Sequence, residues 1–283
     1  MPSGNGVETP SGKHAGTENF PVASRLIARR LRRHVMAFYA FARAIDDIAD
    51  SPELAPEDKL ERLGRFEAGL LDPSADAPDK AAALARSLQA THVTQRHALD
   101  LIDAFRQDAV QGRYADWHDL MQYCDRSAAP VGRYLLDLHG EARGLYPLAD
   151  ALCNALQVLN HLQDCADDYR QLDRVYLPQD WLAAEGIEVT ALAAPAASAG
   201  LRRALDRCLA ATDALLHAAR PLPLELASRR LALESAVILA IAERLSALLK
   251  RADPLAGRVR LDRRQDIAAA CTGLWRQLAG RWA

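Results

Sequence analysis

The sequence has few aromatic residues, no long apolar run and almost no net charge. Aromatic residues make up 6% of the 283 residues, and no segment reaches the roughly 20 uninterrupted apolar residues that a membrane-spanning helix needs. The formal net charge of −2 at pH 7 gives no long-range field to attract nucleic acid. We therefore expect no spanning helix and no nucleic-acid partner, and any recognition of an anion must be local.

Cysteine pairs are also missing. The five cysteines are odd in number and widely spaced, without a Cys-x-x-Cys pair, which is typical of a reduced, cytoplasmic protein. Residues 1–17 are rich in Gly, Ser and Pro and contain no apolar run, so we expect a disordered leader there and not a signal peptide. No long polar linker follows the leader, which favours one domain over residues 18–283.

Alanine and leucine, by contrast, are abundant and recur at spacings of three and four residues. Hydrophobic residues make up 50% of the chain, and the dominance of Ala and Leu favours helices over strands. We predict an all-α fold with almost no sheet. The expected helices span residues 34–50, 56–71, 79–89, 94–110, 116–139 with a break near Pro130, 147–172, 199–218, 224–252 and 264–280.

Two of these helices are apolar on nearly every side but carry a polar stripe, and a helix that is apolar all round is expected to be buried. Asp46 and Asp50 lie four residues apart on one face of the first helix. Arg43 and Tyr39 precede them on the same face. The stripe on the second helix comprises Gln157, Asn160, Asp164 and Asp168.

Buried carboxylates without partners would cost several kcal/mol each, so we expect cations beside the two stripes. Oxygen ligands of this kind suit Mg²⁺ better than zinc or copper, and Mg²⁺ keeps part of its shell for phosphate oxygens. Facing Asp stripes are therefore expected to hold a diphosphate through bridging metals. Arg43 and the metals would take up charge as a carbon–oxygen bond breaks, while apolar helix faces shelter the carbocation from water.

The alternative for a single Asp-x-x-x-Asp motif is a solvated helix face or a capping cluster. Two motifs make that interpretation less favoured. The acidic residues Asp46, Asp47 and Asp50 also crowd a helix C-terminus, where the macrodipole disfavours anions. Tyr39 and Tyr123 are either core aromatics or substrate contacts, and the sequence leaves both interpretations open.

The motifs Asp46-Asp47-Ile48-Ala49-Asp50 and Gln157-x-x-Asn160-x-x-x-Asp164-x-x-x-Asp168, followed by Arg174-Val175-Tyr176-Leu177-Pro178, resemble the squalene/phytoene synthase family. Tyr123-Cys124 with Pro130-Val131-Gly132 is similar to the family's central helical segment. The resemblance covers nearly the whole chain from Glu18. It implies a single-domain isoprenoid synthase bundle around a central apolar pocket, with Mg²⁺ as cofactor.

Three segments resemble the family's hydroxysqualene synthase branch of bacterial hopanoid biosynthesis, namely residues 18–24, 160–165 and 173–178. This resemblance implies conversion of presqualene diphosphate and water to hydroxysqualene and diphosphate, without NADPH. The implied partners are presqualene diphosphate and the enzymes upstream and downstream in the squalene pathway.

Carried over from the family, the implied roles fall into three groups. The magnesium ligands or their close support are Asp46, Asp50, Asn160, Asp164 and Asp168, of which the four aspartates are also counted as catalytic. The diphosphate or prenyl contacts are Asn19, Tyr39, Arg43, Asp47, Gln157, Arg174 and Tyr176. Tyr123 is the candidate for admitting the water that quenches the cation.

The sequence departs from the family pattern at three points. Asn19-Phe20-Pro21 stands where phytoene and dehydrosqualene synthases have a serine pair, Gln163 stands where many relatives have an arginine, and no tyrosine follows Tyr176. These losses favour an enzyme with one diphosphate site over one that condenses two prenyl diphosphates.

Three other functions remain as alternatives. A head-to-head prenyl transferase making presqualene diphosphate, phytoene or dehydrosqualene would use the same metals and helices. A non-catalytic assembly factor of the family would have broken Asp motifs, which this chain does not have. A ferritin-like di-iron bundle calls for Glu-x-x-His pairs, and neither stripe contains one.

Two surface features have a membrane interpretation. The basic run over residues 25–34 is interpreted first as a solvated surface, with contact to anionic lipid or a substrate phosphate as the alternative. Trp275 and Trp282, near Arg276 and Arg281, are interpreted first as core packing. The alternative is that the last helix docks on the inner face of a membrane.

Overall fold

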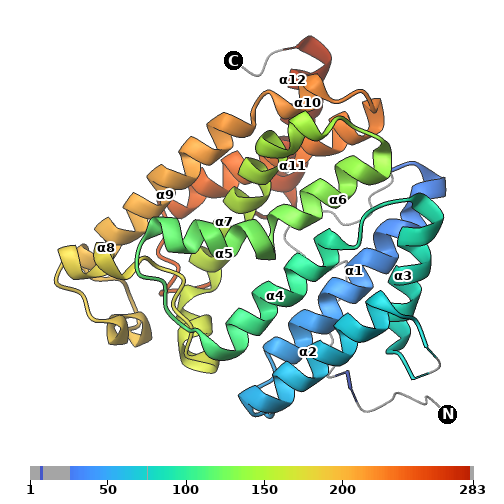
Figure 1. Cartoon of the computed structure of the whole chain (residues 1–283). Helices are drawn as coiled ribbons and strands as arrows, with labels where there is room; N and C mark the ends of the chain where they lie inside the picture. Colours follow the sequence, from blue (N-terminus) through green and yellow to red (C-terminus); the bar gives the residue numbers. More distant parts are fainter. Residues whose placement is uncertain (1–6, 9–25, 75, 281–283) are drawn as a thin grey trace.

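The computed structural model describes residues 7–8, 26–74 and 76–280, and these residues form helices joined by short loops (Figure 1). Within these ranges the extended pairing is limited to one isolated bridge between Arg113 and Val175. The helices are α1 (Arg29–Ala49), α2 (Pro56–Leu71), α3 (Asp79–Thr91), α4 (Arg96–Val110), α5 (Trp117–Ser127), α6 (Ala129–His139), α7 (Tyr146–Leu172), α8 (Gln179–Ala184), α9 (Ala199–Ala219), α10 (Leu222–Glu225), α11 (Arg229–Leu249) and α12 (Arg263–Ala279), with 3₁₀ turns η1 (Arg143–Leu145) and η2 (Val189–Ala193). The prediction of an all-α fold is confirmed.

The predicted helices differ from the observed ones mainly at their ends. The prediction of one helix over 224–252 is wrong at its start, because α10 ends at Glu225 and Ser228 begins a new helix by accepting a hydrogen bond from the backbone of Leu231. The break near Pro130 is confirmed as the boundary between α5 and α6. The short helices α8 and α10 and the two 3₁₀ turns were not predicted, since one or two turns show no periodicity.

The first four helices pack around their own group of apolar side chains. Phe41 of α1 and Phe66 of α2 are fully buried and meet edge to face, with ring centroids 5.8 Å apart. Figure 1 shows α1 to α4, in blue to teal, side by side at one end of the molecule.

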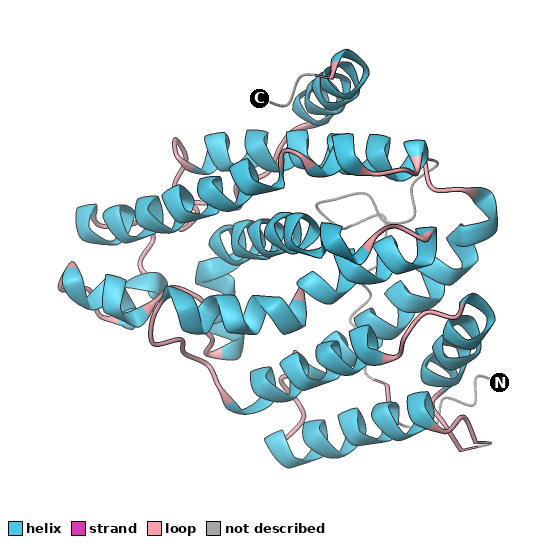
Figure 2. Cartoon of the chain, turned by 45° about the horizontal axis from the view of Figure 1, so that its top comes forward, coloured by secondary structure: helices cyan, strands magenta, loops and turns pink. Residues whose placement is uncertain are grey.

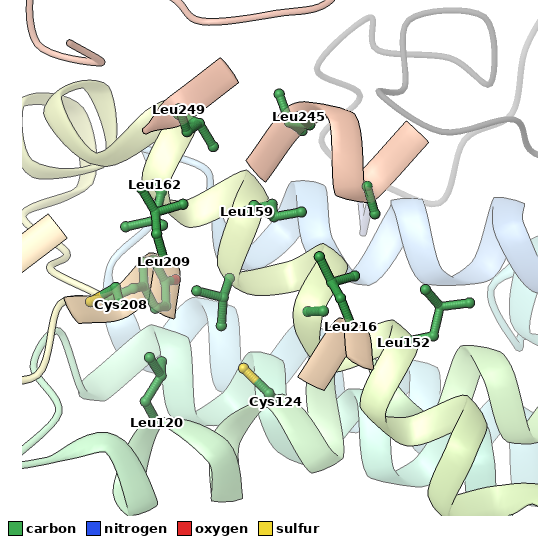
Figure 3. Close-up of a cluster of buried hydrophobic side chains, with 14 of the residues drawn as sticks. Leu120, Cys124, Leu152, Leu159, Leu162, Cys208, Leu209, Leu216, Leu245 and Leu249 are labelled. Carbon is green, nitrogen blue, oxygen red and sulfur yellow. The ribbon is translucent and has the colours of Figure 1, made fainter. Parts of the chain in front are cut away.

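The second group of buried side chains surrounds α7. Leu159 and Leu162 of α7 lie among residues of α5, α9 and α11, including Leu120, Leu209 and Leu245 (Figure 3). Helix α6 joins the two groups, because its Tyr134 and Leu138 belong to the first and its Leu136 to the second. The two apolar groups therefore meet at α6, and α1 and α7 come to lie in one bundle.

Helix α12 forms an outer layer on α11, and Figure 2 shows it beyond the rest of the bundle. It begins with a capping box between Asp262 and Gln265. A Cβ atom on Gly273 would collide with the carbonyl oxygen of Ala236, so the close approach of the two helices requires glycine there. Across the described ranges, no helix is long and apolar enough to cross a membrane.

Two residues of the predicted leader are described. Val7 is buried and its carbonyl accepts a hydrogen bond from Arg62, while Glu8 pairs with Lys80 at 2.6 Å. The other residues of 1–17 lie outside the described ranges, as does Asn19. The disordered leader and the 18–283 domain boundary stay predictions.

Candidate active site

A polar pocket of about 330 Å³ lies between the end of α1 and the C-terminal half of α7. Its wall includes ten of the predicted site residues: Arg43, Asp46, Asp50, Tyr123, Gln157, Asn160, Asp164, Asp168, Arg174 and Tyr176. Five carboxylates and three guanidinium groups line it, which leaves a formal excess of two negative charges when all are ionised. A pocket with this balance favours cations, and its arginines provide contacts for an anion that arrives with them.

Cationic side chains offset the crowding of acids at the end of α1. The guanidinium of Arg43 pairs with Asp46 and, at 3.1 Å, with Asp47. Arg174 donates to Asp50 at 2.6 Å and to the carbonyl of Ala49 at 2.8 Å. Because cations are favourable at a helix C-terminus, these contacts hold the three aspartates where the helix dipole alone would disfavour them.

The acids of the facing stripe of α7 also have nearby side chains. Arg258, from the loop after α11, approaches Asp164 at 3.4 Å. The imidazole of His161 lies 4.0 Å from Asp168 and contacts Gln157 at 3.1 Å. An anion bound in the pocket would compete with Asp164 for Arg258.

The segment after α7 brings Arg174 and Tyr176 into the pocket. Asp173 ends α7 in the left-handed conformation, with φ of 51°, and the chain then runs alongside residues 112–115, which follow α4. The amide of Val175 donates to the carbonyl of Gly112 at 2.9 Å. A Cβ atom on Gly112 would lie 2.7 Å from the carbonyl oxygen of Asp173, so this close approach requires glycine.

A buried carboxylate, Asp108 of α4, forms part of the floor of the pocket. The hydroxyl of Tyr123 donates to it at 2.6 Å and that of Tyr176 at 3.0 Å. Burial raises the pKa of Asp108 to about 6, although the nearby Arg174 favours its charged form. Burial and the Asp108 charge likewise raise the pKa of Tyr123 well above its usual value. The two phenols are therefore neutral hydrogen-bond donors at neutral pH.

Gln163 of α7 does not line the pocket. Its side chain is 3% exposed and donates to the carbonyl of Val259 at 2.6 Å, one residue from Arg258. The residue that departs from the family pattern therefore anchors the loop that supplies an arginine to Asp164.

An apolar pocket of about 260 Å³ adjoins the polar one. Most of its wall consists of aliphatic and aromatic side chains from α1, α6, α7 and α11, such as Phe38, Leu152 and Ile238. Asn160 lines both pockets, so they meet at this residue. The geometry provides a polar compartment for a charged group next to a compartment for a hydrocarbon chain.

The oxygen donors fit the predicted Mg²⁺ in type. Asp46 and Asp50 come from α1, while Asn160, Asp164 and Asp168 come from α7, and all line the same pocket. In the part of the chain that the structure describes, no three carboxylate, imidazole or thiol groups are gathered closely enough to hold a metal by themselves. Binding would therefore require contributions from both helices and from an anion between them.

The structure separates two of the predicted contacts from the polar pocket. Tyr39 lines the apolar pocket, and Asp47 lines neither pocket but holds Arg43.

Sequence reasoning missed Asp108, His161 and Arg258. A sequence pattern could have identified Asp108, because it is a carboxylate at a position that continues the apolar stripe of Leu101, Ala104 and Phe105. No sequence pattern identifies Arg258, since it comes from an irregular loop.

Comparison with known proteins agrees with this geometry. The family model described as squalene/phytoene synthase matches residues 13–265. A hydroxysqualene synthase of Rhodopseudomonas palustris is 46% identical, over 90% of this chain and 87% of its own, and one of Zymomonas mobilis is 41% identical, over 94% and 90%. The crystal structure of squalene synthase HpnC from Alicyclobacillus acidocaldarius has a TM-score of 0.72 and 32% identity, covering 81% of this chain and 87% of that one. The chain belongs to the squalene/phytoene synthase family.

Proposed function

We propose that this chain is a magnesium-dependent hydroxysqualene synthase that converts presqualene diphosphate and water to hydroxysqualene and diphosphate. The observation that carries the proposal is the meeting of a charged pocket and an apolar pocket at Asn160. Such a site suits a substrate with one diphosphate group and a long hydrocarbon. The similarity to two hydroxysqualene synthases over most of the chain supports this choice within the family.

The proposed mechanism begins with an exchange of ion pairs. Arg43, Arg174 and Arg258 release their aspartates and bind diphosphate oxygens. Asp46 and Asp50 on one side, and Asn160, Asp164 and Asp168 on the other, would then hold Mg²⁺. When bound, Mg²⁺ supplies positive charge that stabilises the departing diphosphate.

The apolar pocket receives the rest of the substrate. Its wall excludes bulk water from the carbocation that remains after the carbon–oxygen bond breaks. Tyr123 and Tyr176 both donate to Asp108, and these hydrogen bonds hold the segment with Arg174 and Tyr176 against the wall of the polar pocket. No nicotinamide cofactor enters this reaction, because the product is an alcohol formed from water without a change of oxidation state overall.

The test uses purified full-length protein with Mg²⁺ and without NADPH. Presqualene diphosphate and farnesyl diphosphate are supplied separately, and lipid products are identified by mass spectrometry. Hydroxysqualene from presqualene diphosphate alone is the expected result. Presqualene diphosphate, phytoene or dehydrosqualene formed from a linear precursor would identify a head-to-head prenyl transferase, and no turnover of either substrate would favour an assembly factor.

We also propose that the protein works in the cytoplasm, at the inner membrane face, with α12 in contact with anionic lipid. Ile267, Trp275 and Leu278 on this helix are 55%, 57% and 79% exposed. Exposed Arg263 and Arg264 lie at its start. This combination of apolar and basic side chains is typical of a surface-bound helix. The exposure of Trp275 contradicts the core-packing interpretation, while Trp282 lies outside the described residues.

Sedimentation with lipid vesicles tests the contact. Vesicles with phosphatidylglycerol are expected to retain the protein, and Leu278→Gln with Trp275→Gln is expected to release it. Leu71→Gln, at an exposed leucine of α2, is the control. If the vesicles retain wild type, the α12 variant and the control equally, or do not retain wild type, then α12 is not the lipid contact.

A further inference from the structure

One acidic side chain lies in the apolar pocket. Glu234 of α11 is 2% exposed and is the single carboxylate among the described residues that line this pocket. Leu231, Ser235 and Ile238 of the same helix also line it. Positions 231, 234, 235 and 238 form one face of a helix, so Glu234 is the ionisable side chain on a face that otherwise carries two aliphatic side chains and a serine.

A carboxylate in this position is chemically distinctive. It is a Brønsted base among aliphatic side chains, whereas a leucine there would simply continue the apolar wall. Other polar groups of the pocket are poor proton acceptors. The hydroxyl of Tyr134 donates to the backbone of His34 at 2.9 Å, and burial raises the pKa of the Cys153 thiol to about 12.

We propose that Glu234 holds the water molecule that captures the carbocation and accepts its proton. This inference rests on the proposed function. The water oxygen forms the new carbon–oxygen bond, one of its O–H bonds breaks, and the proton passes to the carboxylate. Carbocation, water and carboxylate thus become alcohol and carboxylic acid, without an oxidant or reductant.

The position of Glu234 also explains how capture can be separated from ionisation. Tyr123, the candidate from sequence, lies in the polar pocket with its hydroxyl engaged by Asp108. A water held there would lie beside the departing diphosphate. Glu234 lies on α11, in the compartment that receives the hydrocarbon, and is therefore placed to act on the cation after the diphosphate has separated from it.

The test compares Glu234→Gln with wild type in two measurements, diphosphate release and the lipid product. The substitution keeps the volume of the side chain but removes its basicity. We expect diphosphate release to stay within about threefold of wild type, while the alcohol falls about tenfold or more as a share of products. Hydrocarbons without oxygen, formed by proton loss from the cation, replace it.

Two further variants control for folding and for shape. Glu234→Asp keeps the carboxylate one methylene group further away and is expected to give an alcohol share between those of wild type and Glu234→Gln. Ser246→Ala removes a buried hydroxyl near the other end of α11, where it donates to Asp213 at 2.6 Å, and is expected to leave the product unchanged. If Glu234→Gln does not fold, the product of Glu234→Asp decides.

Three results overturn the inference. An unchanged alcohol share in Glu234→Gln shows that another group handles the water. An equal fall of diphosphate release and alcohol, in a folded variant, assigns Glu234 to ionisation or binding. If wild type makes no alcohol from presqualene diphosphate, the proposed function fails first, and the role of Glu234 fails with it.

Discussion

Asp108 is the residue on which the floor of the polar pocket depends. It receives both phenol hydroxyls, from Tyr123 on α5 and Tyr176 on the segment after α7, and so ties three parts of the chain together. Its raised pKa has a defined consequence for stability. The folded protein binds the Asp108 proton more tightly than the unfolded chain does, so the stability it contributes is present at low pH and is lost as pH rises through about 6.

We predict that Asp108→Asn removes this pH dependence. Between pH 5 and pH 7, the wild-type free energy of unfolding should fall relative to that of the variant by about 1 kcal/mol. Urea-induced unfolding of both proteins in EDTA, followed by circular dichroism, measures the difference. No difference in pH dependence between the two proteins over this range would mean that the carboxylate is already charged in the folded protein well below pH 5.

Gln163 is expected to act on the site through the backbone that it holds. Gln163→Leu leaves the carbonyl of Val259 without its donor, at a cost of about 1–3 kcal/mol if that carbonyl stays buried. The loop with Arg258 should loosen, which raises KM for the prenyl diphosphate with a smaller change in kcat. Steady-state kinetics of Gln163→Leu and Arg258→Ala, side by side, test this. A raised KM in Arg258→Ala alone would show that Gln163 does not hold the loop.

At the scale of the element, periodicity predicted the long helices because each has an apolar face that repeats over many turns. It placed α2 at 56–71, as observed, but began the first helix at residue 34, whereas α1 begins at Arg29. The apolar signal starts only after the basic run, and the polar first turn has no periodicity to detect. The break between α10 and α11 was not predicted because an apolar signal is present there. Leu226, which lies between the two helices, fits the apolar spacing of a continuous helix.

The contact of α12 with α11 gives a prediction at this scale. Gly273→Val places side-chain atoms where the backbone of Ala236 lies, so α12 must shift outward, and we expect a loss of about 1–3 kcal/mol. Thermal unfolding and proteolysis near residue 273 measure it. Gly144→Ala, where a Cβ atom meets nothing within 4 Å, should have little effect. Equal stability of the two variants would mean that α12 is not packed on α11 as described.

For the whole molecule, the sequence predicted which two helices carry the acids but not which distant parts complete the site. Residues four apart share a helix face by geometry alone. The sequence therefore predicted the pair Asp46 and Asp50 and the pair Asp164 and Asp168. Arg258 and Glu234 enter the pockets only through the packing of α11 and its loop on α7. Local spacing contains no information about such contacts.

The ion-pair exchange that we propose implies that metal and anion bind together. Mg²⁺ with inorganic diphosphate should raise Tm by several degrees, corresponding to about 2.7 kcal/mol at a hundredfold excess over Kd. Mg²⁺ or diphosphate alone should raise it less than half as much. Thermal shift assays of wild type, Asp168→Asn and the control Asp206→Asn measure this. A full shift with Mg²⁺ alone, or in Asp168→Asn, would contradict the shared site.

The meeting of two unlike pockets at Asn160 gives the binding site a direction. A molecule with a charged head group and a hydrocarbon tail fits the site in one orientation. The proposed reaction then breaks a bond of that molecule near the boundary between the polar and apolar pockets. One product is soluble in water and the other in lipid, so the two products are released into different surroundings. Neither fragment alone can fill both compartments, and each therefore leaves room for the other. The two products are expected to inhibit as independent ligands, able to occupy the same enzyme molecule at once.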